Sequence, residues 1–447
     1  MPPTTQERHV SGMQLENNYN AQAPLPDTVG AAVSGLRIAL ILMGATIALP
    51  AFVMGATLNA QMGTRGSIIA SIVGGFVLAC IAAAAAVVGA HSRLSSYQLI
   101  LRAFGSRGGK WVNACLSVVM VGWFAVVASL FGDAALRAGG HVLPLSSEGW
   151  LALGIIAMTG TTLAGFRALD ILASLTTPLK ILLLASTVYV SLSKTGGVGL
   201  WTTPQHPALS GPQGTSFVVG GVIVGALLTP DLARLAASRS QAALACFLAF
   251  AIGQPLVLCL AGIPARLAGE SDLVRIMLSL GLGLPAILVV ILAAWSSNAY
   301  NLYAITLVYR TFTRAATWKL ALFGGSLGGA LALFGLARRL TPFLLVLSVA
   351  IPPIAGVYLA AYYISWAMRE APAERSWRAD SLAAWLTGIA VAGLEGPLAF
   401  SLTGVTAVDA LLVSMIAYAA FHFFFYRPRQ AQQAAALAHA VHRGNNK

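Results

Sequence analysis

Charged residues are scarce in this sequence. Asp, Glu, Lys and Arg together make up 9% of its 447 residues, whereas they make up about a quarter of an ordinary soluble domain. The chain also lacks a phosphate-binding G-x-x-x-x-G-K-[ST] loop and an H-E-x-x-H zinc motif. These shortages exclude a soluble domain and give no support for an enzyme or a nucleotide-driven pump. No catalytic residue, cofactor or metal is expected, apart from a coupling ion.

Cysteine is rare as well. The four cysteines, Cys80, Cys115, Cys246 and Cys259, fall within apolar runs and show no C-x-x-C spacing. This pattern is typical of neither a metal site nor a disulfide framework. We therefore expect all four to be small apolar core residues.

Long apolar runs dominate what is present. The chain is 57% hydrophobic, with a mean hydropathy of +0.79, and about 20 apolar residues suffice for one helix to cross a bilayer. The sequence predicts an all-α membrane protein with twelve spans at 36–58, 67–90, 112–136, 149–166, 171–193, 216–236, 241–265, 284–306, 317–337, 342–366, 380–402 and 406–426.

The basic residues indicate the orientation of these spans. Of the 27 Lys and Arg residues, roughly 19 fall on the side of the two termini and about 7 in the opposite loops, which by the positive-inside rule puts both termini in the cytoplasm. We expect cytoplasmic tails at 1–34 and 427–447 around a transporter domain at 35–426, in the inner (plasma) membrane. The net charge of +13 is thus a topology signal, and no nucleic-acid partner is expected.

Two spans at corresponding positions contain helix breakers. Spans one to five (35–193) and six to ten (216–366) form two units, and the odd number of crossings inverts the second relative to the first, with 380–426 as an addition. Interrupted helices at corresponding positions of two halves point to the binding site of a secondary transporter, because unwound backbone at membrane depth survives only where it lines a cavity. The breakers of spans one and six are Gly44, Pro50, Gly55, Gly220, Gly221, Gly225 and Pro230.

Span eight is unusually polar for a membrane helix. Its Ser296 and Ser297 hydroxyls suit a monovalent cation, while Asn298 and Asn301 offer donors and acceptors to a flat polar solute. The alternative is that the serines bond their own helix and the asparagines bridge helices.

Two further residues stand out at bilayer depth. Trp123 lies beside Gly122, away from the interfacial belt where Trp usually occurs, and offers a stacking face to an aromatic solute, or else packs in the core. Lys180 is the one Lys or Arg deep within a span, where an ammonium costs several kcal/mol. We hypothesise that Lys180 lies beside Ser296 and Ser297 and couples transport to H⁺; the alternative is a Lys that snorkels to the cytoplasmic side.

The order of several short motifs resembles the nucleobase:cation symporter family, most closely its cytosine permease branch. Singly each motif is weak, but in this order they are specific. They are Asn17-Asn18-Tyr19, Pro24-Leu25-Pro26, Val121-Gly122-Trp123-Phe124, Thr229-Pro230-Asp231-Leu232-Ala233-Arg234, Trp295-Ser296-Ser297-Asn298 and Ala350-Ile351-Pro352-Pro353-Ile354-Ala355-Gly356-Val357.

The resemblance implies a leucine-transporter-type fold, a five-plus-five inverted repeat with broken helices 1 and 6 and two further helices. Members of this family take up nucleobases, hydantoins, allantoin or related heterocycles with Na⁺ or H⁺. By position, the cation would meet the backbone or hydroxyl oxygens of Gly44, Ala48, Ala293, Ser296 and Ser297. The substrate site would comprise Trp123, Met120, Gly221, Val222, Asn298 and Asn301.

The chain departs from cytosine permease within this site. Met120 stands where that branch has a Gln, Val222 where it has a second stacking aromatic, and Val224 where it has a nearby serine. An unpaired polar edge of a buried solute costs about 1–3 kcal/mol, so cytosine itself is expected to bind poorly unless Asn298 or Asn301 replaces the lost bonds.

The sequence therefore predicts a symporter that imports a purine, a pyrimidine or a relative such as hydroxymethylpyrimidine by alternating access. The expected partners are this small heterocycle and the lipid bilayer, with no obligate protein partner. The rival reading is a membrane sensor or channel on the same scaffold.

Overall fold

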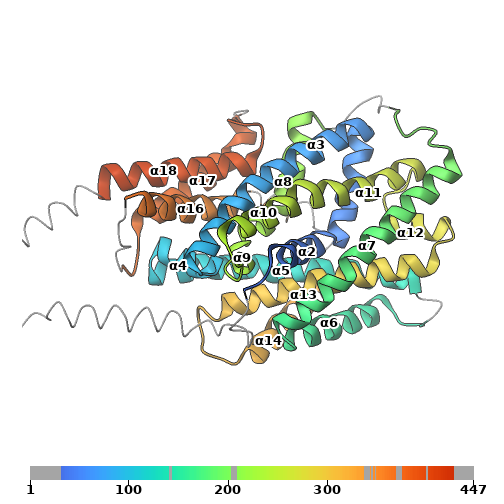
Figure 1. Cartoon of the computed structure of the whole chain (residues 1–447), viewed down its shortest axis with the longest axis horizontal. Coiled ribbons are helices and arrows are strands. Elements are labelled where there is room, and N and C mark those ends of the chain that lie inside the picture. Colours follow the sequence, from blue (N-terminus) through green and yellow to red (C-terminus); the bar gives the residue numbers. More distant parts are fainter. Residues whose placement is uncertain are drawn as a thin grey trace, which may run out of the picture.

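The fold is described from a computed structural model. Placement is described for residues 32–139, 143–202, 209–336, 343, 346–347, 349–368, 375–398 and 401–426. The two tails predicted from the sequence lie outside these ranges, apart from residues 32–34. Among the described residues every regular element is a helix, and one isolated bridge joins Val33 to Ala236 (Figure 1).

Within the described residues, helices occupy most of each predicted span. The first half contains α2 (Gly35–Thr46), α3 (Leu49–Ser92), α4 (Ser96–Phe104), α5 (Ser106–Gly139), α6 (Ser147–Leu163) and α7 (Phe166–Thr195). The second contains α8 (Gly211–Leu227), α9 (Pro230–Ala233), α10 (Arg239–Leu248), the π-helical turn η1 (Ala249–Gly253), α11 (Gln254–Ala268), α12 (Leu273–Ser279), α13 (Gly283–Tyr309), α14 (Thr317–Leu333) and α16 (Pro352–Met368). The last elements among the described residues are α17 (Ala379–Leu398), α18 (Thr406–Phe421) and η3 (His422–Tyr426).

Seven helices in the described part of the chain are long and apolar enough to cross a membrane. The protein is thus a multi-pass membrane protein by helix length and composition. The count of twelve spans and the inverted repeat stay predictions, as do the boundaries of the two units.

The helical backbone is interrupted near the middle of the first predicted span. Helix α2 ends at Thr46 and α3 begins at Leu49, so Ile47 and Ala48 lie outside regular helix. Helix α3 then carries on into the second span through a non-helical Gly63, whose φ of 73° suits a residue without a Cβ.

The sixth predicted span differs from the expectation in the place of its break. Helix α8 runs without interruption through Gly220, Gly221 and Gly225 and ends at Leu227. Pro230 then opens the short α9, where its missing N–H costs no helical bond. The break thus lies between α8 and α9, and the three glycines lie within the continuous helix α8.

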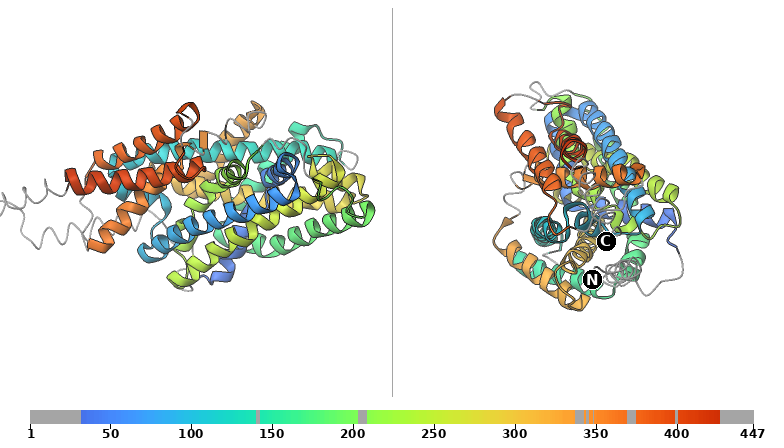
Figure 2. Two further views of the ribbon diagram at one scale, coloured as in Figure 1. Left: turned by 90° about the horizontal axis from the view of Figure 1, so that it is seen from above. Right: turned by 90° about the vertical axis from the view of Figure 1, so that its left-hand side faces the viewer.

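Most helices run side by side along the long direction of the bundle (Figure 1). Helix α3 packs against α8 and α11, and α13 packs against α5, α6 and α7. Helices α16, α17 and α18 gather at one end of the view beside α4, and Figure 2 shows the same grouping from two further sides. The helices α3, α5, α8 and α13 thereby surround the interruption between α2 and α3.

At the end of the bundle where α2 begins, the chain ahead of α2 is tied to the chain after α9. The Val33 N–H donates to the Leu235 carbonyl at 2.9 Å, and the Ala237 N–H donates to the Val33 carbonyl at 3.2 Å. Arg93, in the loop after α3, donates to the Arg234 carbonyl at 2.8 Å. These bonds connect, at this end of the bundle, elements that are distant in sequence.

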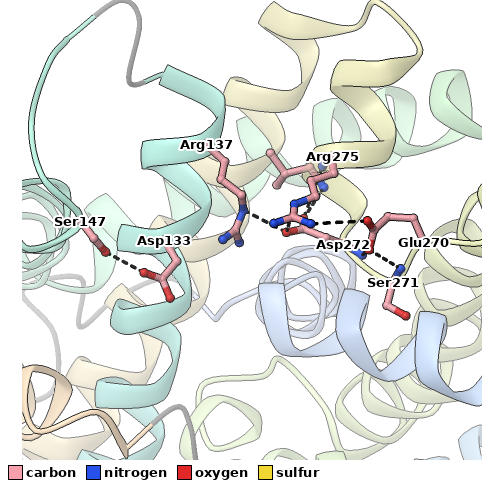
Figure 3. A network of polar contacts seen from close by, with 8 residues as sticks. Asp133, Arg137, Ser147, Glu270, Ser271, Asp272 and Arg275 are labelled. Atoms are coloured by element: carbon pink, nitrogen blue, oxygen red, sulfur yellow. Dashed lines mark hydrogen bonds and ion pairs between the residues drawn. The ribbon is translucent and has the colours of Figure 1, made fainter.

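The opposite end holds a network of charged side chains (Figure 3). Arg137 of α5 pairs with Asp272, the N-cap of α12, at 2.9 Å, and Arg275 pairs with Glu270 at 3.7 Å. The backbone N–H groups of Asp272 and Ser271 hydrogen-bond the Glu270 carboxylate and hold its pKa below the usual range. Because the groups are solvent-exposed, the network orients the loop ahead of α12 more than it stabilises the fold.

The cysteine prediction is wrong for two of the four residues. Cys80 and Cys115 are exposed on the outer surface of the bundle, whereas Cys246 is buried and Cys259 is partly buried. A thiol is apolar enough to face lipid as easily as a core, so hydropathy alone does not separate the two positions.

Close approach of α3 and α9 gives the first testable prediction. A Cβ at Gly89 would lie 2.6 Å from the Cα of Pro230, so Gly89→Ala is expected to destabilise the protein by about 1–3 kcal/mol through overpacking. Thermal unfolding of purified protein in detergent measures this. The matched control is Gly160→Ala in α6, where a Cβ meets nothing within 4 Å and Ala favours the helix; equal melting temperatures for the two variants would contradict the packing argument.

Candidate functional site

A cavity of about 110 Å³ lies where the interruption between α2 and α3 faces α5, α8 and α13. An apolar cavity of about 150 Å³ holds benzene, so this space is on the scale of one small ring. Most of its lining side chains are apolar. The polar side chains that line it are Thr46, Ser297, Tyr300 and Asn301.

Trp123 of α5 lines this cavity and is partly buried. Its ring stacks on that of Phe343, with centroids 6.2 Å apart and an angle of 26° between the planes. A Cβ at the neighbouring Gly122 would lie 3.0 Å from the Phe343 ring, so glycine at this position lets the second aromatic approach. The sequence did not identify Phe343 as the partner of Trp123, because the two residues are 220 positions apart.

Met120, Gly221 and Val222 also line the cavity. A Cβ at Gly221 would lie 2.2 Å from Cε of Met54, so glycine leaves room there for the α3 side chain. With Met120 and Val222, these groups make the α5 and α8 sides of the cavity apolar.

The two asparagines of α13 lie differently. Asn301 lines the cavity, and its Nδ2 donates to the Met120 carbonyl at 3.2 Å. Asn298 is fully buried, does not line the cavity, and donates to the Phe124 carbonyl at 3.0 Å. Asn298 therefore bridges α13 and α5, as the alternative interpretation expected, and its proposed contact with substrate is not supported by its position.

Lys180 of α7 lies fully buried at the interruption of the first span. Its Nζ donates to the Gly44 carbonyl at 2.7 Å and to Ser296 Oγ at 2.7 Å, and it lies 3.5 Å from the Ile47 carbonyl. The Ser296 hydroxyl in turn donates to the Leu292 carbonyl at 2.8 Å, which leaves its lone pair for the ammonium. None of the ion pairs found among the described residues includes Lys180, and the partners that its ammonium contacts there are uncharged oxygens.

Close packing of α2 on α7 makes this arrangement possible. A Cβ at Gly44 would lie 2.6 Å from Oγ1 of Thr177, one turn before Lys180. Glycine at position 44 thus brings the two backbones close enough for the ammonium to reach the carbonyls at the end of α2.

The other residues predicted for the cation site lie around this ammonium in different ways. Ser297 points to the cavity and not to Lys180, because adjacent residues on a helix diverge by about 100°. Ala48 lines the cavity, and the carbonyl facing Lys180 is that of Ile47. Ala293 is fully buried on α13. The cation contacts implied by the resemblance for Ala48, Ala293 and Ser297 stay predictions.

Tyr300 is a cavity residue that the sequence interpretation did not select. It stands in the polar run of span eight, three residues after Ser297, so helical spacing was the signal that could have found it.

The fold is shared with solved secondary transporters. Mhp1, a nucleobase-cation-symport-1 family transporter in a closed conformation with bromovinylhydantoin bound, matches with a TM-score of 0.77 at 17% identity, over 87% of this chain and 91% of that one. Inward-facing Mhp1 gives a TM-score of 0.70 at 18% identity, over 89% and 94%. A substrate-bound, outward-open Na⁺-coupled sialic acid symporter gives 0.66 at 12%, over 88% and 90%.

Sequence comparison points to the same family. No family model matches the chain. The chain is 28% identical over 408 residues to the cytosine permease of Escherichia coli strain K12, which covers 91% of this chain and 94% of the relative. The resemblance to the nucleobase:cation symporter family, in its cytosine permease branch, is thus confirmed.

The position of Trp123 generates the second prediction. If the cavity holds the substrate ring, Trp123→Ala is expected to remove about 1–3 kcal/mol of substrate affinity, the usual contribution of a base stacked on an aromatic side chain. The control is Trp111→Ala on the same helix, whose side chain is 66% exposed. Binding of radiolabelled cytosine or uracil to purified protein measures the effect; a loss of folded protein with unchanged affinity in the remainder would assign Trp123 to the core.

Proposed function

We propose that the chain is a secondary active symporter that imports a nucleobase or a related nitrogen heterocycle together with a proton by alternating access. The observation that carries the proposal is the pairing of a ring-sized cavity with a buried ammonium at the interruption of the first span. In this proposal the chain lies in the plasma membrane, with both termini in the cytoplasm.

The substrate class follows from the cavity and from the relatives. The cavity combines the Trp123 face with a few polar groups on α13, which suits a small planar ring with polar edges. The curated relatives are named cytosine permeases, and the Mhp1 structure is described with a bound hydantoin. Since Met120 and Val222 make two sides of the cavity apolar, a nitrogen heterocycle other than cytosine is the preferred substrate.

The proton is the coupling ion because the ammonium of Lys180 meets the oxygen groups that would bind a cation. Its contacts, the Gly44 carbonyl and the Ser296 hydroxyl, come from α2 and α13, so a protonated Lys180 fastens both elements to α7. Loss of the proton on the cytoplasmic side would remove the charge and one of the three N–H donors, which would weaken these bonds and loosen the contact between α2, α7 and α13.

Proton symport fixes how substrate accumulation depends on the pH gradient. Protons enter with the substrate, so accumulation is expected to rise when the outside is more acidic than the inside and to stop when neither a pH difference nor a membrane potential remains. Binding that never leads to flux would instead favour a sensor, and flux that ignores every ion gradient would favour a channel.

Lys180→Ala gives the third prediction. In liposomes, the variant is expected to lose accumulation driven by a pH gradient but to keep exchange of substrate between the two sides, because exchange needs no net proton movement. Radiolabelled substrate uptake measures both modes, and Lys194→Ala, at an exposed lysine that bonds the Leu280 carbonyl, is the matched control. Na⁺-dependent uptake that survives Lys180→Ala would overturn proton coupling and restore Na⁺ as the coupling ion.

Met120→Gln gives the fourth prediction. The side chain lines the cavity, while the bond to Asn301 uses the Met120 backbone carbonyl and is retained. The amide is expected to gain a hydrogen bond to cytosine and raise its affinity several-fold, with a further rise when Val222→Phe restores a second aromatic face. Competition binding measures both; tight cytosine binding by the parent with no gain in the variants would show that specificity has not shifted.

A further inference from the structure

Three exposed cations form a cluster where α4 is followed by α5. Arg107 and Lys110 stand at positions i and i+3 in the first turns of α5, and both are exposed, so they share one face of the helix. Arg102, near the end of α4, is exposed as well. A Cβ at Gly109 would lie 2.6 Å from the Cα of Leu101. Because consecutive Cα atoms are about 3.8 Å apart, the Cα atoms of Arg102 and Lys110 are at most about 12 Å apart, within reach of one ligand.

This cation cluster has no ion-pair partner in the described part of the chain. None of the ion pairs found there includes its members, and the sequence has no Asp or Glu between Asp27 and Asp133. The carboxylates beside α4 are engaged elsewhere. Asp231 is buried and accepts from the Ser96 N–H at 2.8 Å, and Asp380 pairs with the arginine two residues before it. Three neighbouring positive charges therefore attract an anion from outside the chain.

The position of the cluster along α5 corresponds to the depth of lipid headgroups. Helix α5 contains 34 residues and is about 50 Å long, whereas the hydrocarbon core of a bilayer is about 30 Å thick. The apolar run of this span begins at Val112, directly after the cluster. Trp111, which is 66% exposed, stands at this boundary, as is typical of Trp at a membrane interface. Arg107 and Lys110 are therefore expected to lie among the headgroups.

The chain ahead of α17 packs against the same turn of α5. The N–H groups of Arg107 and Gly108 donate to the Ser376 carbonyl at 2.8 and 3.1 Å. A Cβ at Gly108 would lie 3.3 Å from the ring of Trp377, so this indole, which is 46% exposed, lies over the start of α5. Because these N–H groups are already bonded, the side chains of the cluster, and not the helix terminus, supply the donors for an anion.

We propose that the junction of α4 and α5 binds the headgroup of an anionic phospholipid. Arg102, Arg107 and Lys110 contact the phosphodiester, since guanidinium and ammonium groups are strong donors to phosphate oxygens. The indoles of Trp111 and Trp377 offer apolar surface beside it, which an acyl chain would cover and a free phosphate would not. Basic sites of this kind beside membrane helices bind anionic headgroups. This inference is independent of the transported substrate.

The test titrates purified protein in detergent with phosphatidylglycerol and with phosphatidylcholine as the zwitterionic reference, and native mass spectrometry measures the bound lipid. The parent is expected to bind phosphatidylglycerol more tightly. The double variant Arg107→Gln with Lys110→Gln is expected to weaken this binding by about fivefold for each charge removed and to leave phosphatidylcholine binding unchanged. Thermal unfolding without added lipid checks that the variant is folded. If it is not, Lys110→Gln alone is measured, with an expected loss of about fivefold.

The matched control is Arg314→Gln with Lys319→Gln, which removes two exposed charges near the start of α14. The Lys319 ammonium already lies 5.4 Å from the centre of the Trp318 ring. This variant is expected to bind phosphatidylglycerol as the parent does. An equal loss in the two double variants would show a general attraction of surface charge and overturn the site.

Two further outcomes would overturn the proposal. One is a parent that binds phosphatidylglycerol no more tightly than phosphatidylcholine, the result expected if Glu370 and Glu374, which lie outside the described residues, neutralised the cluster. The other is displacement of the lipid by inorganic phosphate at an equal concentration, which would assign the cluster to a free anion. Either outcome leaves the proposed transport function intact, because none of these measurements involves the transported substrate.

Discussion

The buried ammonium of Lys180 is the interaction on which the arrangement of the site depends. Three elements that are far apart in sequence, α7, the end of α2 and α13, converge on a single nitrogen. Carbonyl groups freed by the interruption would be costly at membrane depth without a donor, and an ammonium would be equally costly without acceptors. Each therefore makes the other tolerable at the interruption between α2 and α3.

The cavity lies directly beside this junction. Ser296 and Ser297 are neighbours on α13, yet one contacts the lysine and the other faces the cavity. One turn of a single helix thus contacts both the ammonium and the cavity. Any displacement of α13 caused by a change at Lys180 would reach the cavity directly, without a chain of intermediate contacts.

Much of the fold was readable from the sequence, because a bilayer demands long apolar segments and the sequence patterns follow that demand. Lys180 was also readable, since a single charge among apolar residues has few explanations. The directions of individual side chains were not readable. Asn298 and Asn301 are both amides on α13, yet only Asn301 lines the cavity. Phe343 and Trp123 are far apart in the sequence and meet only in the folded chain. The interruption fell at Ile47 and Ala48, between the Gly and Pro that marked it, because tertiary hydrogen bonds decide which residues leave the helix.

The bonds of Val33 to Leu235 and Ala237 give the transporter a mechanical property. They join the segment that precedes the first span to the segment that follows the sixth. The two interrupted spans are therefore connected by backbone hydrogen bonds at one end of the bundle. A motion that opens that end must either carry both segments as one body or exchange two backbone bonds for bonds to water, which are similar in energy. The net free energy of this exchange is therefore small. The two bonds would change the rate at which the two segments separate more than the equilibrium between the joined and the separated arrangement.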